Sequence, residues 1–274
     1  MRVGEAIGAL AYRLARHRRG IARRNLELCF PALTEGERRQ LLRDNFRYLG
    51  RGLAETALGW YGGRAVDRLP CDIQGLEHLE QARADGSPVI LMSGHFMCVE
   101  LAARMIGPHV AMAAIYKPMA GRVVFDRAMR AGRERNVAAV MPRDDVRGMV
   151  RALKRGLPVW YAGDQDYGRR HSVFVPFFGV EAATITALTA LSRMSGARVV
   201  PLFFHALPDD GGYAITFEPA LDGFPSGDEV ADARRMNEVV EAAVRRHPEQ
   251  YFWVHRRFKR QADRQRDRYA DIAG

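Results

Sequence analysis

A short apolar run followed by a turn and an amphipathic segment constrains the fold of this chain more than any other feature. Residues 89–92 (Val-Ile-Leu-Met) form an apolar run of the length expected of a buried strand. Ser93 and Gly94 interrupt the run, and from Met97 onward apolar residues recur at helical spacing. His95 therefore lies where a buried strand ends and a helix begins, the position at which open α/β sheets collect ligands and catalytic groups.

Glu100 stands five residues after His95, early in the expected helix. Because helical side chains lean toward the N-terminus of their helix, we expect the Glu100 carboxylate to reach the His95 imidazole. A neutral imidazole with one nitrogen bonded to a carboxylate presents the other nitrogen as a proton acceptor, which is what a general base needs. A lone histidine after a strand is more often a cap or a satisfied polar group, so the pair alone leaves both interpretations open.

The remaining sequence predicts an alternation of strands and helices. Strands are expected at 110–116, 137–141, 158–162, 199–204 and 213–218, and helices at 123–133, 146–154, 181–194 and 228–246. A capping box at 34–37 predicts the start of a long helix that stops at 62–63. The pattern predicts an α/β fold with a mixed, mainly parallel sheet flanked by helices. We expect residues 1–66 to form a basic amphipathic and helical segment packed on the core, and residues 67–274 to form the α/β domain, together one structural unit.

The net charge of +10 is concentrated at the two ends of the chain. Residues 1–24 hold seven arginines against Glu5, and residues 255–268 hold six arginines and Lys259 against two aspartates. The first segment also carries an apolar stripe at helical spacing: Val3, Ile7, Leu10, Ala11 and Leu14. A basic amphipathic helix of this kind can lie on an anionic membrane surface, and a solvated helix packed on the domain fits the same pattern equally well.

No transmembrane segment is expected in this chain. The longest run without Lys, Arg, Asp or Glu, residues 87–99, has 13 residues, whereas a spanning helix needs about 18 or more. The first 20 residues lack the uninterrupted apolar core and the cleavage site of a secretory signal. We therefore expect a protein that is peripheral to the membrane.

Composition also narrows the possible ligands. Cys29, Cys71 and Cys98 are too few and too scattered for a disulfide framework or a thiolate cluster, which favours a reducing compartment. His95 has no second histidine at a metal-ligand spacing such as HExxH, so we expect no metal and no cofactor. Aromatic residues are not interleaved with the basic runs, so no nucleic-acid partner is expected. A basic membrane- or nucleic-acid-binding module is the non-enzymatic alternative.

Polar residues follow three of the predicted strands. His95 follows the first, Arg143 follows the strand at 137–141, and Asp164 and Asp166 follow the strand at 158–162. If these strands are parallel, the three clusters meet along one edge of the sheet, and their convergence would form a site.

The HxxxxE spacing and several longer segments resemble the late acyltransferases of lipid A biosynthesis, within the glycerolipid acyltransferase superfamily. The segments are NLELCFP at 25–31, WYAGDQDYG at 160–168, SVFVPFFG at 172–179 and YFWVHRRFK at 251–259. The resemblance covers roughly residues 23–259 and implies a glycerolipid acyltransferase-like fold. It also implies transfer of a fatty acyl group from acyl carrier protein to a hydroxyl of a Kdo-bearing lipid A precursor, at the cytoplasmic face of the inner membrane.

The resemblance assigns roles to the catalytic pair. His95 would take the proton of the acceptor hydroxyl as it attacks the thioester, and Glu100 would orient the imidazole and stabilise the imidazolium. No acyl-enzyme is expected, because the chain has no GxSxG motif and Cys98 is expected to point off a helix.

Five further residues are candidate substrate contacts. Arg143 corresponds in position to a superfamily arginine near the acceptor phosphate or the developing oxyanion; a surface ion pair with a neighbouring aspartate is the alternative. Asp164 and Asp166 would bind the acceptor sugar, hold Arg143 or cap their loop, and we favour a structural or supporting role. Arg256 and Arg257 would meet phosphates of the lipid or the acceptor, or form a charged solvated face.

An acyltransferase acting on another glycolipid, such as a phosphatidylinositol mannoside, fits the same residues, because the dyad would serve any sugar hydroxyl.

Two features depart from the family pattern. Family members usually carry an apolar N-terminal segment that enters or spans the bilayer, and this chain begins after the point where that segment would end. Gly163 stands where the family often has proline.

Overall fold

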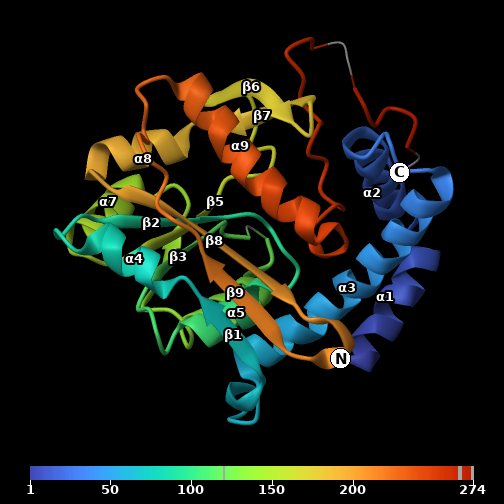
Figure 1. The fold of residues 1–274 in the computed structure, drawn as a ribbon. Helices are drawn as coiled ribbons and strands as arrows, with labels where there is room; N and C mark the ends of the chain where they lie inside the picture. Colours follow the sequence, from blue (N-terminus) through green and yellow to red (C-terminus); the bar gives the residue numbers. More distant parts are fainter. Residues whose placement is uncertain (120, 265–266, 273–274) are drawn as a thin grey trace.

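The computed structural model of the chain describes residues 1–119, 121–264 and 267–272. Arg266, part of the basic segment at 255–268, lies outside the described residues. Three N-terminal helices, α1 (Arg2–Leu14), α2 (Arg16–Cys29) and α3 (Glu35–Tyr61), stand beside a central sheet (Figure 1). Within the described residues, no helix combines the length and the apolar character needed to cross a bilayer.

The central sheet has seven strands in the order β1-β9-β8-β2-β5-β3-β4. The strands from β8 to β4 run parallel to one another, whereas β9 is antiparallel to β8 and carries β1 parallel at the edge. The mixed, mainly parallel sheet predicted from the strand–helix alternation is therefore confirmed. The strands are β1 (Cys71–Gln74), β2 (Val89–Ser93), β3 (Ala113–Tyr116), β4 (Ala139–Pro142), β5 (Val159–Ala162), β8 (Arg198–Ala206) and β9 (Tyr213–Phe217).

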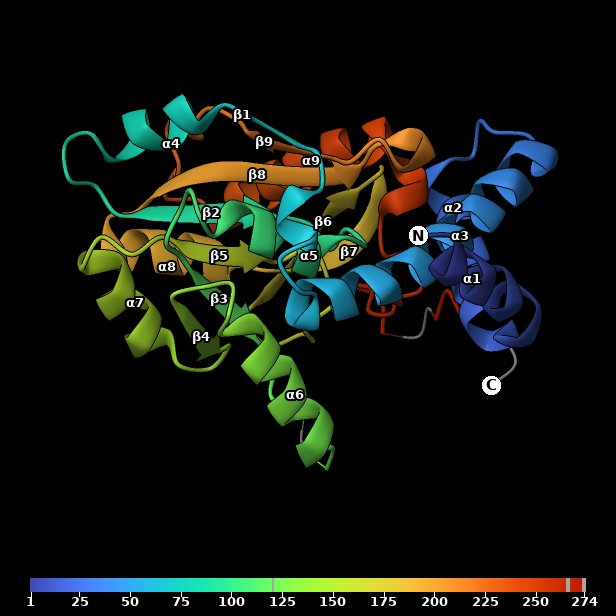
Figure 2. The ribbon, with the colours of Figure 1, turned by 90° about the horizontal axis from the view of Figure 1, so that it is seen from below.

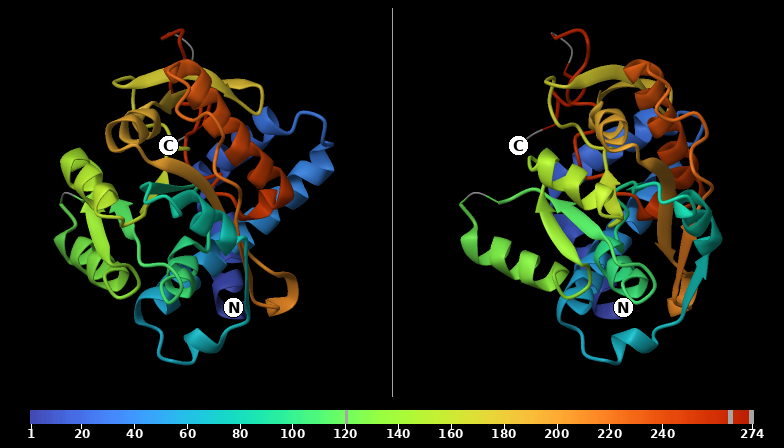
Figure 3. Two further views of the ribbon diagram at one scale, coloured as in Figure 1. Left: turned by 60° about the vertical axis from the view of Figure 1, so that its left-hand side comes forward. Right: turned by 90° about the vertical axis from the view of Figure 1, so that its left-hand side faces the viewer.

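Helices cover both faces of this sheet (Figures 2 and 3). They are α4 (Leu76–Arg83), α5 (Val99–Ile106), α6 (Val123–Arg133), α7 (Val146–Lys154), α8 (Ala187–Ser195) and α9 (Glu229–Arg246), with short 3-10 turns at Val66–Arg68, Pro208–Asp210 and Pro248–Gln250. Leu91 of β2 packs in a cluster with residues of α4 and α5, and Ile90 packs in a second cluster with residues of α7 and α8. Because both faces of β2 are buried, its sequence is continuously apolar rather than alternating.

Local signals predicted several boundaries well. The helices α6 and α7 occupy the predicted ranges 123–133 and 146–154. The capping box is present at the start of α3, where Thr34 N donates to Glu37 Oε2 at 2.7 Å and Glu37 N donates to Thr34 Oγ1 at 3.3 Å. The helix ends at Tyr61, directly before Gly62, as predicted.

The prediction of a helix over 181–194 is wrong in its first part. A hairpin of β6 (Ser172–Phe177) and β7 (Val180–Ile185) occupies this region, and α8 begins only at Ala187. The turn between the strands has positive φ at Phe178 (52°) and Gly179 (72°), which suits a tight hairpin. Six residue pairs join the two strands, so pairing with β6 overrides the helix propensity of the alanines at 182–183.

The helices α1 and α3 touch through their backbones. A Cβ atom on Gly8 would lie 2.1 Å from the Phe46 carbonyl oxygen, and one on Gly50 would lie 2.1 Å from the Gly4 carbonyl oxygen. Only glycine allows such an approach, so α1 is fixed on α3 in one orientation. Four of the five residues of the predicted apolar stripe of α1 are exposed, with 77% of Val3, 48% of Ile7, 53% of Leu10 and 70% of Leu14 accessible, whereas Ala11 is partly buried against the core.

Candidate active site

The three predicted polar clusters lie at one edge of the sheet. The strands β2 and β5 are parallel neighbours, with Ser93 aligned to Ala162. His95 and Asp164 each follow these aligned residues by two positions, and neighbouring strands are only about 4.8 Å apart, so the register brings the two side chains together. Arg143 follows β4, which is parallel to the same strands and separated from β5 by β3.

His95 is bonded to Asp164 at two points. The imidazole Nδ1 lies 2.5 Å from Oδ1, and the backbone N–H of His95 donates to Oδ2 at 2.9 Å. Tyr251 donates its hydroxyl to the same Oδ2 at 2.7 Å. Asp164 is 1% exposed, whereas 34% of the His95 side chain is accessible, so the ring stands at the surface on a buried carboxylate.

Asp164 is ionised in this arrangement. Burial alone would raise the pKa of Asp164, but the charge that His95 carries when it is protonated and the hydrogen bonds from His95 and Tyr251 outweigh burial and hold the pKa below its ordinary value. A carboxylate only accepts hydrogen bonds, so the proton of the neutral imidazole resides on Nδ1. In the described part of the chain Nε2 has no hydrogen-bond partner, which leaves it available to accept a proton.

Glu100 does not contact His95 in the way predicted. Its carboxylate accepts from Arg133 Nε at 2.9 Å, from Arg133 Nη2 and from Trp60 Nε1 at 2.7 Å. The helix α5 begins at Val99, later than expected, and the backbone of Glu100 packs against Gly59 of α3. Its side chain therefore turns toward α3 and α6, and Asp164 supplies the carboxylate at the imidazole.

The segment at 249–255 backs this site and was not assigned a role from the sequence. Phe252 N donates to the His95 carbonyl oxygen at 3.0 Å. The N-terminal helices hold the segment in turn: Asn25 of α2 donates to the carbonyls of residues 253 and 255, and Asn45 of α3 donates to those of 249 and 251. Tyr251 belongs to one of the segments that carry the family resemblance, but nothing in its spacing predicts contact with Asp164.

Asp166 is a structural residue rather than a substrate contact. Its side chain is 1% exposed and accepts from Gly168 N at 2.9 Å and from Arg260 Nη1 at 2.8 Å. Its backbone N–H donates to His255 Nε2 at 3.0 Å. Burial lowers the pKa of His255 to about 4, so this ring is neutral and suited to accept that bond. Asp166 thus caps its loop, the role favoured from the sequence.

The three predicted arginines differ in their surroundings. Arg143 is exposed, lies over the Tyr167 ring at 5.8 Å and, within the described residues, has no carboxylate at ion-pair distance, so its guanidinium remains available to an anion. Arg257 is 2% exposed and donates to Ala183 O at 2.5 Å and Thr184 Oγ1 at 2.9 Å. The prediction that Arg257 meets a phosphate is therefore wrong. Arg256 is 31% exposed, with its guanidinium 3.8 Å from Asp267.

Cys98, the cysteine beside His95 in the sequence, is 2% exposed, and burial raises the pKa of its thiol well above the ordinary value. A thiol of this kind is a packing group rather than an activated nucleophile. Across residues 1–119, 121–264 and 267–272, no group of three or more His, Cys, Asp or Glu side chains is placed to hold a metal ion.

Comparison with known proteins gives a consistent result. Residues 1–260 match the family model of bacterial lipid A biosynthesis acyltransferases. The chain is 41% identical over 270 residues to the lipid A biosynthesis lauroyltransferase of Escherichia coli (strain K12), covering 98% of this chain and 88% of that protein. It is 40% identical over 258 residues to the lipid A biosynthesis palmitoleoyltransferase of the same organism, covering 94% and 84%. Among solved structures, it is similar to the 1-acyl-sn-glycerophosphate acyltransferase of Thermotoga maritima, with a TM-score of 0.41 and 15% identity over 88% of this chain and 97% of that one. The chain belongs to the bacterial lipid A biosynthesis acyltransferase family and is an acyltransferase.

Proposed function

We propose that the protein transfers a fatty acyl group from the thioester of an acyl carrier protein to a hydroxyl of a Kdo-lipid A type precursor. One observation carries the proposal: an accessible imidazole is fixed through Nδ1 on a buried, ionised carboxylate. It stands at the carboxyl edge of a mainly parallel sheet, where substrates of such folds bind. The names of the relatives supply the acceptor class.

The reaction needs one proton acceptor and no covalent enzyme intermediate. The acceptor oxygen attacks the thioester carbonyl carbon while its proton passes to His95 Nε2. The carbon–sulfur bond then breaks, and the leaving thiolate takes the proton back from the imidazolium. A positioned base of this kind contributes about 10²–10⁴-fold to the rate. Asp164 stabilises the imidazolium between these steps, so we assign it as the positioning residue for His95.

Arg143 is available to assist by charge, whereas the charge of Arg133 is paired with that of Glu100. Arg143, at the same sheet edge, would bind a phosphate of the acceptor or the developing oxyanion through its fork of donors. Arg133 holds Glu100 between α5 and α6, and we propose that this pair shapes the substrate side of the site.

We further propose that the protein works as a peripheral protein on the cytoplasmic face of the inner membrane. The helix α1 supports this location, because its exposed apolar stripe is accompanied by Arg2 and Arg13. A helix with this composition binds anionic interfaces by burying its apolar face among the acyl chains.

The test is mass spectrometry of a lipid A precursor incubated with the protein and an acyl donor. His95→Ala removes the proposed base, and His109→Ala, an exposed histidine outside the site, is the matched control. Each protein is offered the same acyl chain on acyl carrier protein and on coenzyme A.

We expect an added acyl mass with the wild type and the His109 variant, a loss with the His95 variant, and preference for the carrier-protein donor. No added mass from folded wild-type protein would reject this acceptor. Equal transfer by the His95 variant would reject the mechanism, and equal use of coenzyme A would reject the donor assignment.

A further inference from the structure

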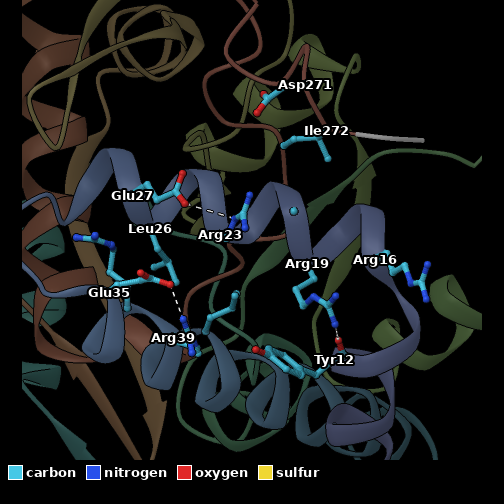
Figure 4. Close-up of a pocket in the computed structure, with 13 residues that line it drawn as sticks. Tyr12, Arg16, Arg19, Arg23, Leu26, Glu27, Glu35, Arg39, Asp271 and Ile272 are labelled. Atoms are coloured by element: carbon cyan, nitrogen blue, oxygen red, sulfur yellow. Dashed lines mark hydrogen bonds and ion pairs between the residues drawn. The ribbon is translucent and has the colours of Figure 1, made fainter.

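A cavity of about 600 Å³ lies between the three N-terminal helices and residues 271–272 (Figure 4). Its most frequent lining side chain is arginine, from α2 and α3: Arg16, Arg19, Arg23, Arg38 and Arg39. Such a volume is in the range that holds a small ligand, and it is much larger than a bare phosphate ion requires.

The positive charge of this cavity is only partly compensated. Arg23 has Glu27 at 3.4 Å, and Arg39 pairs with Glu35. The third acidic residue of the lining, Asp271, is bound at 2.6 Å by Arg24, from outside the lining. The other three arginines, Arg16, Arg19 and Arg38, have no carboxylate at ion-pair distance in the described part of the chain.

Two of these arginines are held in place by uncharged groups. Arg19 donates from Nη1 to the carbonyl oxygen of Tyr12, and its guanidinium lies 5.2 Å from the centre of the Tyr12 ring. Arg38 donates from its own Nη1 to the carbonyl oxygen of Phe30, at 3.3 Å, and to that of Leu33. Guanidinium groups fixed in this way lose little conformational entropy when an anion binds, and they keep further donors for it.

The chemistry of the cavity fits a phosphate. Planar guanidinium forks match phosphate oxygens in pairs, which makes arginine the residue of choice for this group. Leu26, Leu42 and Ile272 contribute apolar surface beside the arginines, so the cavity also suits the carbon groups attached to a phosphodiester.

The neighbouring surface identifies the source of that phosphate as a lipid. Leu14, the last residue of the exposed apolar stripe of α1, stands two residues before Arg16. The exposed apolar stripe of α1 and the arginine-lined cavity thus adjoin at the junction of α1 and α2. This is the order in which a bilayer presents acyl chains and headgroups.

The cavity is distinct from the active site. On α2, Arg18 and Asn25 contact the carbonyls of residues 253–255, which back His95. Helical periodicity places Arg16, Arg19 and Arg23 on the other side of α2, and a helix with its side chains is about 10 Å across.

We propose that the arginine cavity between α1, α2 and α3 binds the headgroup phosphate of an anionic phospholipid and so orients the protein on the membrane. This inference deepens the proposed membrane location and rests on it. In this arrangement α1 inserts into the acyl layer, and the cavity binds the headgroup.

The test is binding to vesicles in the absence of acyl donor and acceptor. The variant Arg16→Gln/Arg19→Gln removes two cavity arginines, and Arg147→Gln/Arg151→Gln removes two exposed arginines from α7, which lies at the other end of the molecule (Figure 2). Both double variants lose the same net charge. Each protein is titrated with phosphatidylcholine vesicles with and without phosphatidylglycerol, and thermal unfolding checks the fold.

We expect the cavity variant to bind the phosphatidylglycerol vesicles about thirtyfold more weakly, because an arginine near an anionic surface contributes about 1 kcal/mol and tenfold corresponds to 1.4 kcal/mol. The α7 variant should bind like the wild type. The single variant Arg16→Gln, whose side chain makes no hydrogen bond or ion pair within the described residues, should lose about fivefold without any change in folding.

Three results would overturn the proposal. Equal losses in both double variants would mean that diffuse charge, not the cavity, attracts the membrane. Unchanged binding of the cavity variants would remove the site altogether. Inorganic phosphate or glycerol 3-phosphate that binds as tightly as the vesicles would show a free-phosphate site. Acyl transfer to a detergent-dispersed acceptor is measured separately, so failure of the proposed function and failure of this inference are distinguishable.

Discussion

Replacing Asp164 with asparagine should reverse the tautomer of the His95 imidazole, which we propose as the base. Two donors, the backbone N–H of His95 and the hydroxyl of Tyr251, point at Oδ2 of the carboxylate. An asparagine of the same shape keeps both bonds only if its carbonyl oxygen occupies that position. Its NH₂ group then faces His95 Nδ1, 2.5 Å from the present Oδ1. An NH₂ group only donates, so Nδ1 must give up its proton and Nε2 must carry it.

An imidazole protonated at Nε2 does not accept the proton of the acceptor hydroxyl. Asp164→Asn should therefore lose most of the contribution of the base, about 10²–10⁴-fold in kcat, which corresponds to roughly 3–5 kcal/mol of transition-state stabilisation. Single-turnover transfer gives the rate. Nitrogen NMR of the histidine ring gives the tautomer, a property that a merely structural role of Asp164 would not change.

The double variant His95→Ala/Asp164→Asn separates positioning from independent action. If Asp164 acts only through the imidazole, adding Asp164→Asn to His95→Ala should cost nothing further, because groups that act as a unit are strongly non-additive. Additive losses, or a single Asp164→Asn variant that keeps its rate within tenfold and its Nδ1 proton, would refute the reasoning.

Three further predictions concern stability and pH. Tyr251→Phe should lower the free energy of unfolding by about 1–3 kcal/mol, because it removes a buried hydrogen bond to the Asp164 carboxylate. Urea unfolding measures this loss, and a variant as stable as the wild type would contradict it. Gly8→Ala should destabilise the protein by about 1–3 kcal/mol in urea, because its Cβ would lie 2.1 Å from the Phe46 carbonyl oxygen, whereas an alanine at Gly36, where the nearest atom is 3.9 Å away, should be tolerated. Burial, with the charges of its neighbours, lowers the pKa of His205 to about 4 from an unfolded value of about 6.5, so the unfolded chain binds more protons between these values and stability falls as the pH is lowered through them. The variant His205→Phe should flatten that fall, and an unchanged slope in urea unfolding would exclude this histidine as its source.

Local sequence signals predicted those parts of the fold that neighbouring residues determine. The capping box of α3 and the apolar periodicity of α6 and α7 indicated where these helices lie, and the continuous apolar run of β2 indicated that both of its faces are buried. The hairpin β6–β7 was missed because its second strand is rich in alanine and threonine and becomes a strand only by pairing with residues 172–177. Such pairing depends on tertiary context, which overrides weak intrinsic propensities.

The sequence predicted at which edge of the sheet the site lies, but not which side chains contact one another there. Parallel strands predicted that His95, Arg143 and Asp164 share one edge, and the topology confirms it. The pairing of His95 with Asp164 depends on the register of β2 and β5, whose contact spans 69 residues of sequence. Helical spacing favoured Glu100 instead. The spacing could not show that Glu100 binds Arg133, because that ion pair depends on where α6 packs.

The position of segment 249–255 late in the chain affects how the protein folds during its synthesis on the ribosome. The contacts of Asn25 and Asn45 with this segment span more than 200 residues, so neither can form until nearly the whole chain has been synthesised. Tyr251, which donates a hydrogen bond to the Asp164 carboxylate, is synthesised in the same late stretch. A nascent chain can therefore assemble β2, β5 and the contact between His95 and Asp164 before the segment that backs the site has been made. Formation of the long-range contacts is slow compared with helix formation. The site therefore receives its backing segment only when the last part of the chain packs against the first.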